Sequence, residues 1–287
     1  MYEFKYQPKL NNVTILDYLN SFHLGNEKIK ELKKPNRILI NGKSEGFNYK
    51  LKENDLLTLL LDEVDPVDSY KSHLDILYED SYILILNKPA SLAVHTDGAK
   101  YTTNTLQNMV KYYYDKKNYH IPVWYLHRLD FDTTGIIVFC KDPLTMSFLS
   151  YELSCHNIKR DYLALVSGIY PNSEEINLPI GRDRHVNGKF RVSDTGKESI
   201  TNVEVIKKFK RYTLVRLSLK TGRTHQIRVH MAYKGHPLLG DTLYGGGNRY
   251  ILRQALHSYY LKLVHPITNE LIEITCEMPS DMKKLLK

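Results

Sequence analysis

Short strand-like segments dominate the chain after about residue 72, and they do not alternate regularly with helical ones. Apolar or alternating runs predict strands at 81–89, 136–140, 160–168 and 212–220, with an Asn-Gly hairpin signal at 185–192. Periodicity and capping signals predict helices at 104–114, 142–153 and 224–234. A doubly wound parallel sheet requires strands and helices in regular alternation, so this order predicts an α+β fold.

A break in this organisation is predicted at 62–72, DEVDPVDSYKS, where an acidic stretch contains a proline and lacks apolar periodicity. It divides the chain into residues 1–72 and residues 73–287. The first part has helical spacing at 15–22 and 26–34 and strand-like runs at 38–43 and 50–61. A part of this size can bury only a small hydrophobic core. We therefore expect it to be either a marginally stable module or one that leans on its neighbour.

The formal net charge of +8 is carried entirely by the second part. Residues 1–72 hold 11 basic and 11 acidic side chains, whereas residues 73–287 hold 29 and 21. Of the arginines, only Arg37 precedes residue 128. Because arginine is suited to bidentate phosphate contacts and to stacking on bases, we expect any polyanionic partner to bind the C-terminal two-thirds.

Membrane and secretory classes are disfavoured by the sequence. No run approaches the roughly 18 apolar residues of a membrane span, and the N-terminus MYEFKYQPKL carries no apolar signal region. The three scattered cysteines, Cys140, Cys155 and Cys276, form neither a disulfide framework nor a CxxC pair. We expect a reduced, cytoplasmic protein, with a monomer as the default state.

The densest polar cluster is HRLDFDTTG (127–135), which lies just before the strand predicted at 136–140. Asp130 in this cluster could be a nucleophile, a general acid or base, or a solvated turn carboxylate, which is the commonest fate of a loop aspartate. The neighbouring His127 and Arg128 favour chemistry, because these groups are costly to hold together without a use.

A second cluster, TGRTHQIRVHM (221–231), runs from a turn into a predicted helix. The simplest interpretation is that Arg223 and Arg228 are surface charges. The apolar flanks instead favour a partly buried Arg228, which requires a carboxylate or an anion as partner. Ile227 is expected to face the core. His225 and His230 are five residues apart and do not stack as metal ligands four apart would, so we expect no protein-held metal.

Tyr162 lies inside the strand-like run KRDYLALVSG. A strand tyrosine usually packs in a core or on a sheet surface, and the strand pattern alone favours that interpretation over a role in a site.

Five ordered motifs resemble the RluA family of RNA pseudouridine synthases. They are LILNKPASLAVH, HRLDFDTTGIIVFCKD, KRDYLALVSG, LKTGRTHQIRVHM and GHPLLGDTLYG, and the resemblance covers about residues 73–287. It implies a mixed, largely antiparallel sheet with flanking helices and a basic cleft for RNA. It also implies an isomerase that acts on specific uridines in ribosomal or transfer RNA.

The resemblance assigns roles residue by residue. Asp130 matches the catalytic aspartate, Tyr162 the active-site tyrosine and Arg228 the basic residue paired with the aspartate. Arg128 matches an arginine that enters the RNA stack where the target base has left. By the same resemblance we expect contacts to the RNA or the uridine from His127, Thr134, Lys88, Arg223 and Ile227.

The chemistry fits these residue types. Pseudouridine formation breaks the N1–C1′ bond of uridine, turns the uracil and rejoins it through C5, so neither a cofactor nor a metal is required. An ionised aspartate can attack the ribose or the base, and the sequence does not choose between them. An arginine partner favours the charged carboxylate, and Tyr162 can stack on the base or help to remove the C5 proton. The target base must first be flipped out of its stack.

The sequence departs from the family pattern in three places. Thr134 replaces a serine, Cys140 stands where alanine is common, and residues 1–72 are only loosely like the small ribosomal-protein-type RNA-binding module of many members. That part keeps a helix pair and the strand-turn ILINGK, but HLGNEKIKELKKPN lacks the usual serine-arginine start of the second helix.

Two other functions compete with this hypothesis. An aspartyl phosphatase is imitated by the D-x-D-x-T pattern from Asp130 to Thr134, with Asp241 as a later acidic partner, but that chemistry needs its aspartates after an apolar strand, whereas here the strand follows. A non-catalytic RNA-binding protein of the same fold predicts the loss of at least one of Asp130, Tyr162 and Arg228, and all three are present.

Overall fold

The computed structural model describes residues 1–63, 67–96 and 104–287. Three residues of the predicted break, 64–66, therefore lie outside the described residues. Within the described ranges, no helix is long and apolar enough to cross a membrane.

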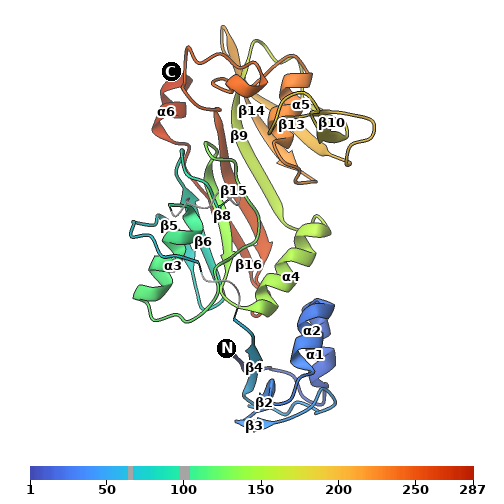
Figure 1. Ribbon diagram of the computed structural model, residues 1–287. Coiled ribbons are helices and arrows are strands. Elements are labelled where there is room, and N and C mark those ends of the chain that lie inside the picture. The colour runs from blue at the N-terminus through green and yellow to red at the C-terminus, as the bar shows by residue number, and fades with distance from the viewer. Residues whose placement is uncertain (64–66, 97–103) are drawn as a thin grey trace.

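The N-terminal part forms a four-stranded antiparallel sheet with two helices (Figure 1). The strand order is β1 (Tyr2–Tyr6), β4 (Leu57–Leu61), β2 (Ile38–Ile40) and β3 (Lys43–Ser44). The helices are α1 (Ile15–Ser21) and α2 (Asn26–Leu32). Asn41 and Gly42 both have positive φ, 49° and 81°, which is the conformation that an Asn-Gly hairpin turn requires. The helix pair and the strand-turn expected from the sequence are thus present.

A ten-stranded mixed sheet makes up the rest of the molecule. Its main path is β10 (Glu174–Asn177), β13 (Ile200–Lys208), β14 (Tyr212–Leu219), β9 (Lys159–Ser167), β15 (Leu256–Val264), β8 (Thr134–Cys140), β6 (Ile83–Lys88) and β5 (Ile76–Glu79). Two further strands join it, β16 (Leu271–Thr275) beside β15 and β7 (Trp124–Tyr125) beside β8. Only the β15–β8 pair is parallel among these described strands. The predicted α+β class and the largely antiparallel sheet are confirmed.

Gly135 is required at the parallel junction between β8 and β15. It has a φ of +106°, and a Cβ at this position would stand 2.1 Å from the backbone oxygen of Ser258. The glycine lets the two strands meet immediately after the loop that carries Asp130.

A separate hairpin and the helices complete the fold. The hairpin pairs β11 (Ile180–Arg182) with β12 (Phe190–Val192), as the Asn-Gly signal predicts. The helices are α3 (Leu106–Lys116), α4 (Pro143–Ser154), α5 (Gln226–Tyr233), α6 (Ser280–Lys283) and the short 3₁₀ turns η1 (Thr242–Tyr244) and η2 (Lys284–Leu286). Asp142 caps α4 through the amides of Leu144 and Thr145, as its sequence signal predicts.

Helix α5 begins two residues later than predicted. His225 has a left-handed backbone, φ 56°, so it cannot continue a helix from Thr224. The side chain of Gln226 instead holds the preceding turn, because its Oε1 accepts hydrogen bonds from the Thr221 hydroxyl at 2.8 Å and the Arg223 amide at 3.0 Å.

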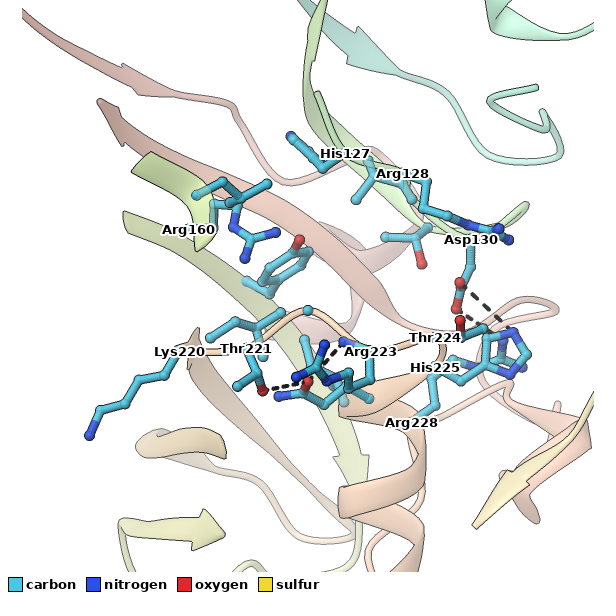
Figure 2. Close-up of a pocket in the computed structure, with 18 of the residues that line it drawn as sticks. His127, Arg128, Asp130, Arg160, Lys220, Thr221, Arg223, Thr224, His225 and Arg228 are labelled. Atoms are coloured by element: carbon cyan, nitrogen blue, oxygen red, sulfur yellow. Dashed lines mark hydrogen bonds and ion pairs between the residues drawn. The ribbon is translucent and has the colours of Figure 1, made fainter. Parts of the chain in front are cut away.

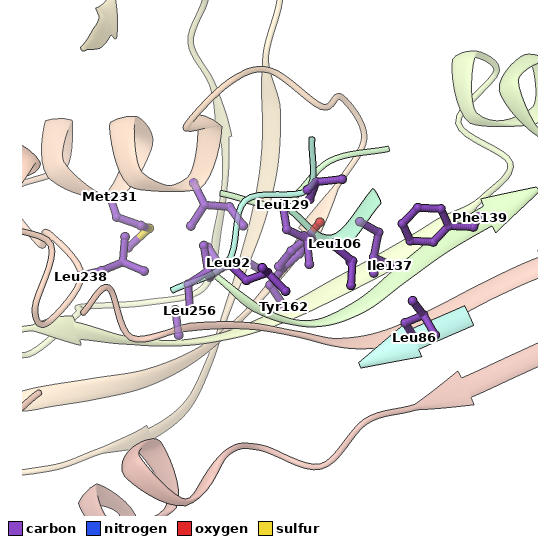
Figure 3. Packing of buried hydrophobic residues seen from close by; sticks show 14 of the residues in the cluster. Leu86, Leu92, Leu106, Leu129, Ile137, Phe139, Tyr162, Met231, Leu238 and Leu256 are labelled. Carbon is purple, nitrogen blue, oxygen red and sulfur yellow. The ribbon is translucent and has the colours of Figure 1, made fainter. Parts of the chain in front are cut away.

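The largest buried cluster lies between the large sheet and the segments that cover it (Figure 3). It includes Tyr162 from β9, Leu129 from the loop before β8 and Ile227 from α5. Three segments far apart in the sequence therefore meet through their apolar side chains, and the polar neighbours of these residues converge at the same place.

Candidate active site

A pocket of about 580 Å³ opens where several segments of the large sheet region meet (Figure 2). Its walls come mainly from the loop before β8, the C-terminal part of α4, the strand β9, the turn after β14 and the start of α5. Seven of the nine site residues predicted from the sequence line it: His127, Arg128, Asp130, Tyr162, Arg223, Ile227 and Arg228.

Asp130 lies in the loop between β7 and β8, and buried interactions fix the backbone of this loop. The Asp130 carbonyl accepts a hydrogen bond from the Thr133 amide at 3.0 Å. The adjacent carbonyl of Phe131 accepts from the ammonium group of Lys88 at 2.9 Å. The carboxylate of Asp130 remains partly accessible, with 18% of the side chain exposed. The loop therefore presents this carboxylate to the pocket from a rigid backbone.

Arg228 connects Asp130 to a second, fully buried carboxylate. Its Nη1 donates to Asp130 Oδ2 at 3.0 Å, while its Nε and Nη2 donate to the two oxygens of Asp241 at 2.7 and 2.9 Å. Burial alone would lower the pKa of Arg228, but the hydrogen bonds and charges of the two aspartates raise it. The guanidinium is therefore permanently charged and held in one orientation.

The apolar flanks of Arg228 predict a carboxylate or an anion beside it, and the structure supplies two carboxylates. The family resemblance implies Asp130 as the partner, whereas the sequence suggests Asp241 only as the later acidic residue of a phosphatase. The sequence signal for this contact is the motif GHPLLGDTLYG, which supplies Asp241 as a partner of Arg228 and Tyr244 as a partner of His225. The Arg228 guanidinium carbon also lies 5.0 Å from the centroid of the Tyr244 ring, within cation–π range.

His225 borders Asp130 on the other side. Its Nδ1 pairs with the Tyr244 hydroxyl at 2.9 Å, and its Nε2 lies 3.8 Å from Asp130 Oδ1, which is too long for a hydrogen bond. Burial lowers the pKa of His225, which favours a neutral ring. One oxygen of Asp130 is thus bound by Arg228, and the other faces the pocket without a hydrogen bond to any residue that the structure describes.

Tyr162 belongs both to the hydrophobic core and to the pocket wall. It lies on β9 opposite Leu217 of β14 and Ser258 of β15, and 5% of it is exposed. Burial raises the pKa of its phenol, so the hydroxyl is protonated at neutral pH. Tyr162 can therefore be a core residue, as the strand pattern favours, and also line the site, as the family resemblance implies.

The predicted RNA-contacting residues of the pocket differ in exposure. Arg128 is exposed beside the Asp130 loop (Figure 2). Arg223 is also exposed, and its Nε donates to the Glu198 carbonyl at 3.0 Å. Both ring nitrogens of His127 are buried without a partner, and burial lowers its pKa to about 3. His127 is therefore a neutral ring, whereas the two arginines supply charge at the opening.

The structure does not bring Lys88 and Thr134 to the pocket surface. Lys88 is fully buried, and its ammonium group donates to the carbonyls of Pro89 at 2.8 Å, Leu92 at 2.8 Å and Phe131 at 2.9 Å. The Thr134 hydroxyl pairs with His257 Nδ1 at 2.9 Å. In this arrangement the hydrogen-bonding groups of both side chains already serve the fold.

The polar groups that suggested other chemistry are separated. Asp132, the second aspartate of the phosphatase-like pattern, accepts hydrogen bonds from Ser91 and does not face Arg228, the partner of Asp130. His230 pairs with Thr201 and Leu178, and His236 pairs with the Ser167 carbonyl. In the part of the chain that the structure describes, no three residues of metal-ligand type come together.

The known proteins that this chain resembles are described as RNA pseudouridine synthases. The sequence model of the family described as RNA pseudouridylate synthase matches residues 82–233. The chain is 43% identical over 258 residues to the uncharacterized RNA pseudouridine synthase YhcT of Bacillus subtilis (strain 168), covering 88% of this chain and 84% of that protein. It is 40% identical to the ribosomal large subunit pseudouridine synthase D of Haemophilus ducreyi, covering 75% and 70%.

Solved structures agree in fold. The human RNA pseudouridylate synthase domain containing 1 superposes with a TM-score of 0.59 at 26% identity, covering 75% of this chain and 86% of that chain. The human RNA pseudouridylate synthase domain containing 4 has a TM-score of 0.61 at 22% identity, covering 74% and 91%.

Proposed function

The chain belongs to the RNA pseudouridylate synthase family and isomerises uridine in RNA, and from that premise we propose that Asp130 is its nucleophile. The observation that carries this proposal is the state of the carboxylate. Arg228, anchored on Asp241, binds one oxygen of Asp130, while the other oxygen faces the pocket and has no hydrogen bond to a described residue. A carboxylate that is oriented in this way through one oxygen is suited to attack on a bound nucleotide through the other.

The reaction balances without an added group. The free oxygen of Asp130 forms a bond to the ribose or to the uracil, and the N1–C1′ bond breaks. The uracil turns in the pocket, C1′ joins C5, the C5 proton leaves and N1 gains a proton as the enzyme carboxylate is released. A flipped-out base fits this sequence of steps, because the ring can turn only outside the RNA stack.

We assign Tyr162 to the wall of the uracil site. Its ring comes from the rigid strand β9 and is packed in the core, so it offers a fixed face on which a base can stack. Its protonated hydroxyl can donate a hydrogen bond, whereas removal of the C5 proton would first require loss of the phenolic proton to a base.

The test of the nucleophile compares Asp130→Asn with the wild type in the release of tritium from C5-labelled uridine in RNA. We expect a loss on the order of 10³-fold or more, because the amide is not a nucleophile while its size is unchanged. Asp132→Asn is the matched control, two residues away on the same loop, and we expect it to keep most of the activity. Equal release from wild type and Asp130→Asn would refute the assignment. A wild type that binds RNA without releasing tritium would support a non-catalytic RNA-binding protein.

We further propose ribosomal RNA as the substrate. Relatives at 38–40% identity carry the name ribosomal large subunit pseudouridine synthase D, which supports ribosomal over transfer RNA. Mapping of pseudouridine in both RNA classes, with and without the gene, should show one or more sites missing from ribosomal RNA. Sites missing only from transfer RNA would contradict this proposal.

We infer that one copy of the chain suffices and that it works in the cytoplasm, where its RNA is found. Light scattering coupled to size-exclusion chromatography tests this, and a stable dimer would contradict it.

A further inference from the structure

Arg160 differs from the other buried cations of the described chain. Five lysine or arginine side chains are buried: Lys88, Lys141, Arg160, Arg228 and Arg253. Lys88 donates to three carbonyls, and Lys141, Arg228 and Arg253 each contact a carboxylate. Arg160 is 8% exposed, its Nε is buried without a partner, and no hydrogen bond or ion pair joins its guanidinium to another described residue. A buried charge without a partner is unfavourable, so its presence calls for a ligand.

The guanidinium points into the pocket at the end away from Asp130 (Figure 2). The edge of the guanidinium that carries Nη1 and Nη2, its terminal edge, faces Gly222. A Cβ at residue 222 would lie 3.5 Å from both Nη1 and Nη2 and 4.0 Å from the guanidinium carbon, which places it in front of the fork formed by the two nitrogens. Gly222 is exposed, so this edge of the fork lies at the pocket surface. The terminal edge is the one that binds two oxygens of a phosphate or carboxylate.

The turn that contains Gly222 cannot easily recede from Arg160. The Thr221 hydroxyl accepts from the Ile200 amide at 2.8 Å and donates to Gln226 Oε1 at 2.8 Å. Because the backbone is held on both sides, a methyl group added at residue 222 would stay in front of the fork. The φ of Gly222 is in the ordinary range and the contact distances are normal, so the fold should accept the methyl group.

The charge around Arg160 favours an anion over a neutral acceptor. Five cationic side chains line the pocket, from Arg128, Arg160, Lys220, Arg223 and Arg228, against two carboxylates. Asp130 is bound by Arg228, and Glu198 forms no ion pair with Arg160 among the described contacts.

We propose that Arg160 and the Gly222 turn form a phosphate subsite, which binds a backbone phosphodiester of the RNA next to the flipped uridine. This inference rests on the proposed use of the pocket for RNA. It adds a second fixed point for the nucleotide, at the opposite end of the pocket from Asp130. The guanidinium fork binds phosphate oxygens in a bidentate way, and the open side of Gly222 gives them access.

The phosphate subsite can be tested by measuring the affinity of the full chain for a fluorescein-labelled decauridylate. Fluorescence anisotropy gives this affinity at a series of NaCl concentrations. Arg160→Met should weaken binding about 10- to 100-fold. It should also make the plot of log affinity against log salt shallower by about 0.7, because one phosphate contact is lost. Its Tm should equal or exceed that of the wild type, since an unpaired buried charge has been removed. Arg160→Lys should keep the slope and lose part of the affinity.

Gly222→Ala supplies an independent test that leaves the charge in place. It should weaken binding, and the double variant with Arg160→Met should bind no more weakly than Arg160→Met alone, because both changes remove the same contact. Arg211 lies just before β14, at the end of this strand that is opposite to the Gly222 turn. Arg211→Met is therefore the control for the loss of one surface charge.

Three results would overturn the proposal. The first is Arg160→Met binding with the affinity and slope of Arg211→Met. The second is a loss of affinity with an unchanged slope, which would assign the fork to a neutral acceptor such as a uracil carbonyl. The third is a lower Tm for Arg160→Met, which would mark Arg160 as a structural residue. Because the assay measures binding without turnover, failure of Asp130→Asn to abolish tritium release would leave these results unaffected.

Discussion

The guanidinium of Arg228 at the pocket wall contacts two carboxylates, and the two contacts are unequal. Asp241 is 1% exposed and accepts two hydrogen bonds from Arg228, whereas Asp130 accepts one and stays partly accessible. The bidentate contact fixes the plane of the guanidinium, and the remaining Nη1 fixes Asp130. Asp241 is thus a positioning residue that acts on Asp130 through Arg228.

The variant Asp241→Asn tests this positioning role. An amide cannot accept both hydrogen bonds from Arg228, so the guanidinium loses its fixed plane, and tritium release should fall about 100-fold after correction for the folded fraction. The pH dependence of the rate should also change, because the charge around Asp130 changes. Asp281→Asn, which removes the carboxylate beside the buried Arg253, is the control. Equal activity of the two variants would contradict a positioning role for Asp241.

At the scale of elements, a carboxylate joins two turns of the large sheet. Asp80 follows β5 and accepts from the Tyr78 hydroxyl and the amides of Tyr82 and Ile83, each at 2.7 Å. It also pairs with Nε2 of His265, just after β15, at 3.0 Å. Burial alone would raise the pKa of Asp80, but these hydrogen bonds lower it far below the usual range.

This lowered pKa predicts a pH-dependent contribution to stability. The unfolded chain holds the proton of Asp80 more tightly than the folded one, so the contribution is full above about pH 5 and is lost as the pH falls below the ordinary aspartate pKa of about 4. Asp80→Asn should cost about 2 kcal/mol at pH 7. Urea unfolding at several pH values measures it, and we expect the difference from the wild type to shrink at acid pH. A difference that is constant with pH would refute this account.

At the scale of the whole molecule, the N-terminal sheet and helices share a core with the large sheet region. Leu144 of α4 is fully buried in the same cluster as residues of β1, β4 and α1. The Tyr6 hydroxyl donates to Asp142 at 2.8 Å, and the rings of Phe4 and Trp124 stack with centroids 5.8 Å apart. Of the two expectations for residues 1–72, these contacts favour a module that leans on its neighbour.

The single tryptophan of the chain reports this contact directly. Since Trp124 lies at the junction, its fluorescence should change in the same transition as the far-ultraviolet circular dichroism if the two parts unfold together. Leu144→Ala should cost about 2–5 kcal/mol by leaving a cavity and should move both signals together. A fluorescence transition that precedes the loss of circular dichroism would show that residues 1–72 unfold separately.

Periodicity, turn chemistry and capping signals are properties of neighbouring residues, and they predict the α+β class, the strands β6, β8, β9 and β14 and the capped start of α4. The roles of Asp130, Tyr162 and Arg228 follow from the resemblance of local motifs to the family, because the strand pattern alone favours a core position for Tyr162. The hydrogen-bond partners of these residues follow from long-range packing instead. Asp130 and Arg228 are separated by 98 positions, and the link from Arg228 to Asp241 depends on how the segment after α5 folds back.

The same limit explains Lys88 and Arg160. Both are basic residues within family-like motifs, and nothing in their spacing distinguishes a cation that supports the fold from one that binds a ligand. Folding surrounds Lys88 with three carbonyls and leaves the fork of Arg160 facing Gly222 without a hydrogen bond to another described residue. Burial and hydrogen-bond satisfaction depend on residues from distant segments, so the difference between the two side chains becomes visible only in the assembled structure.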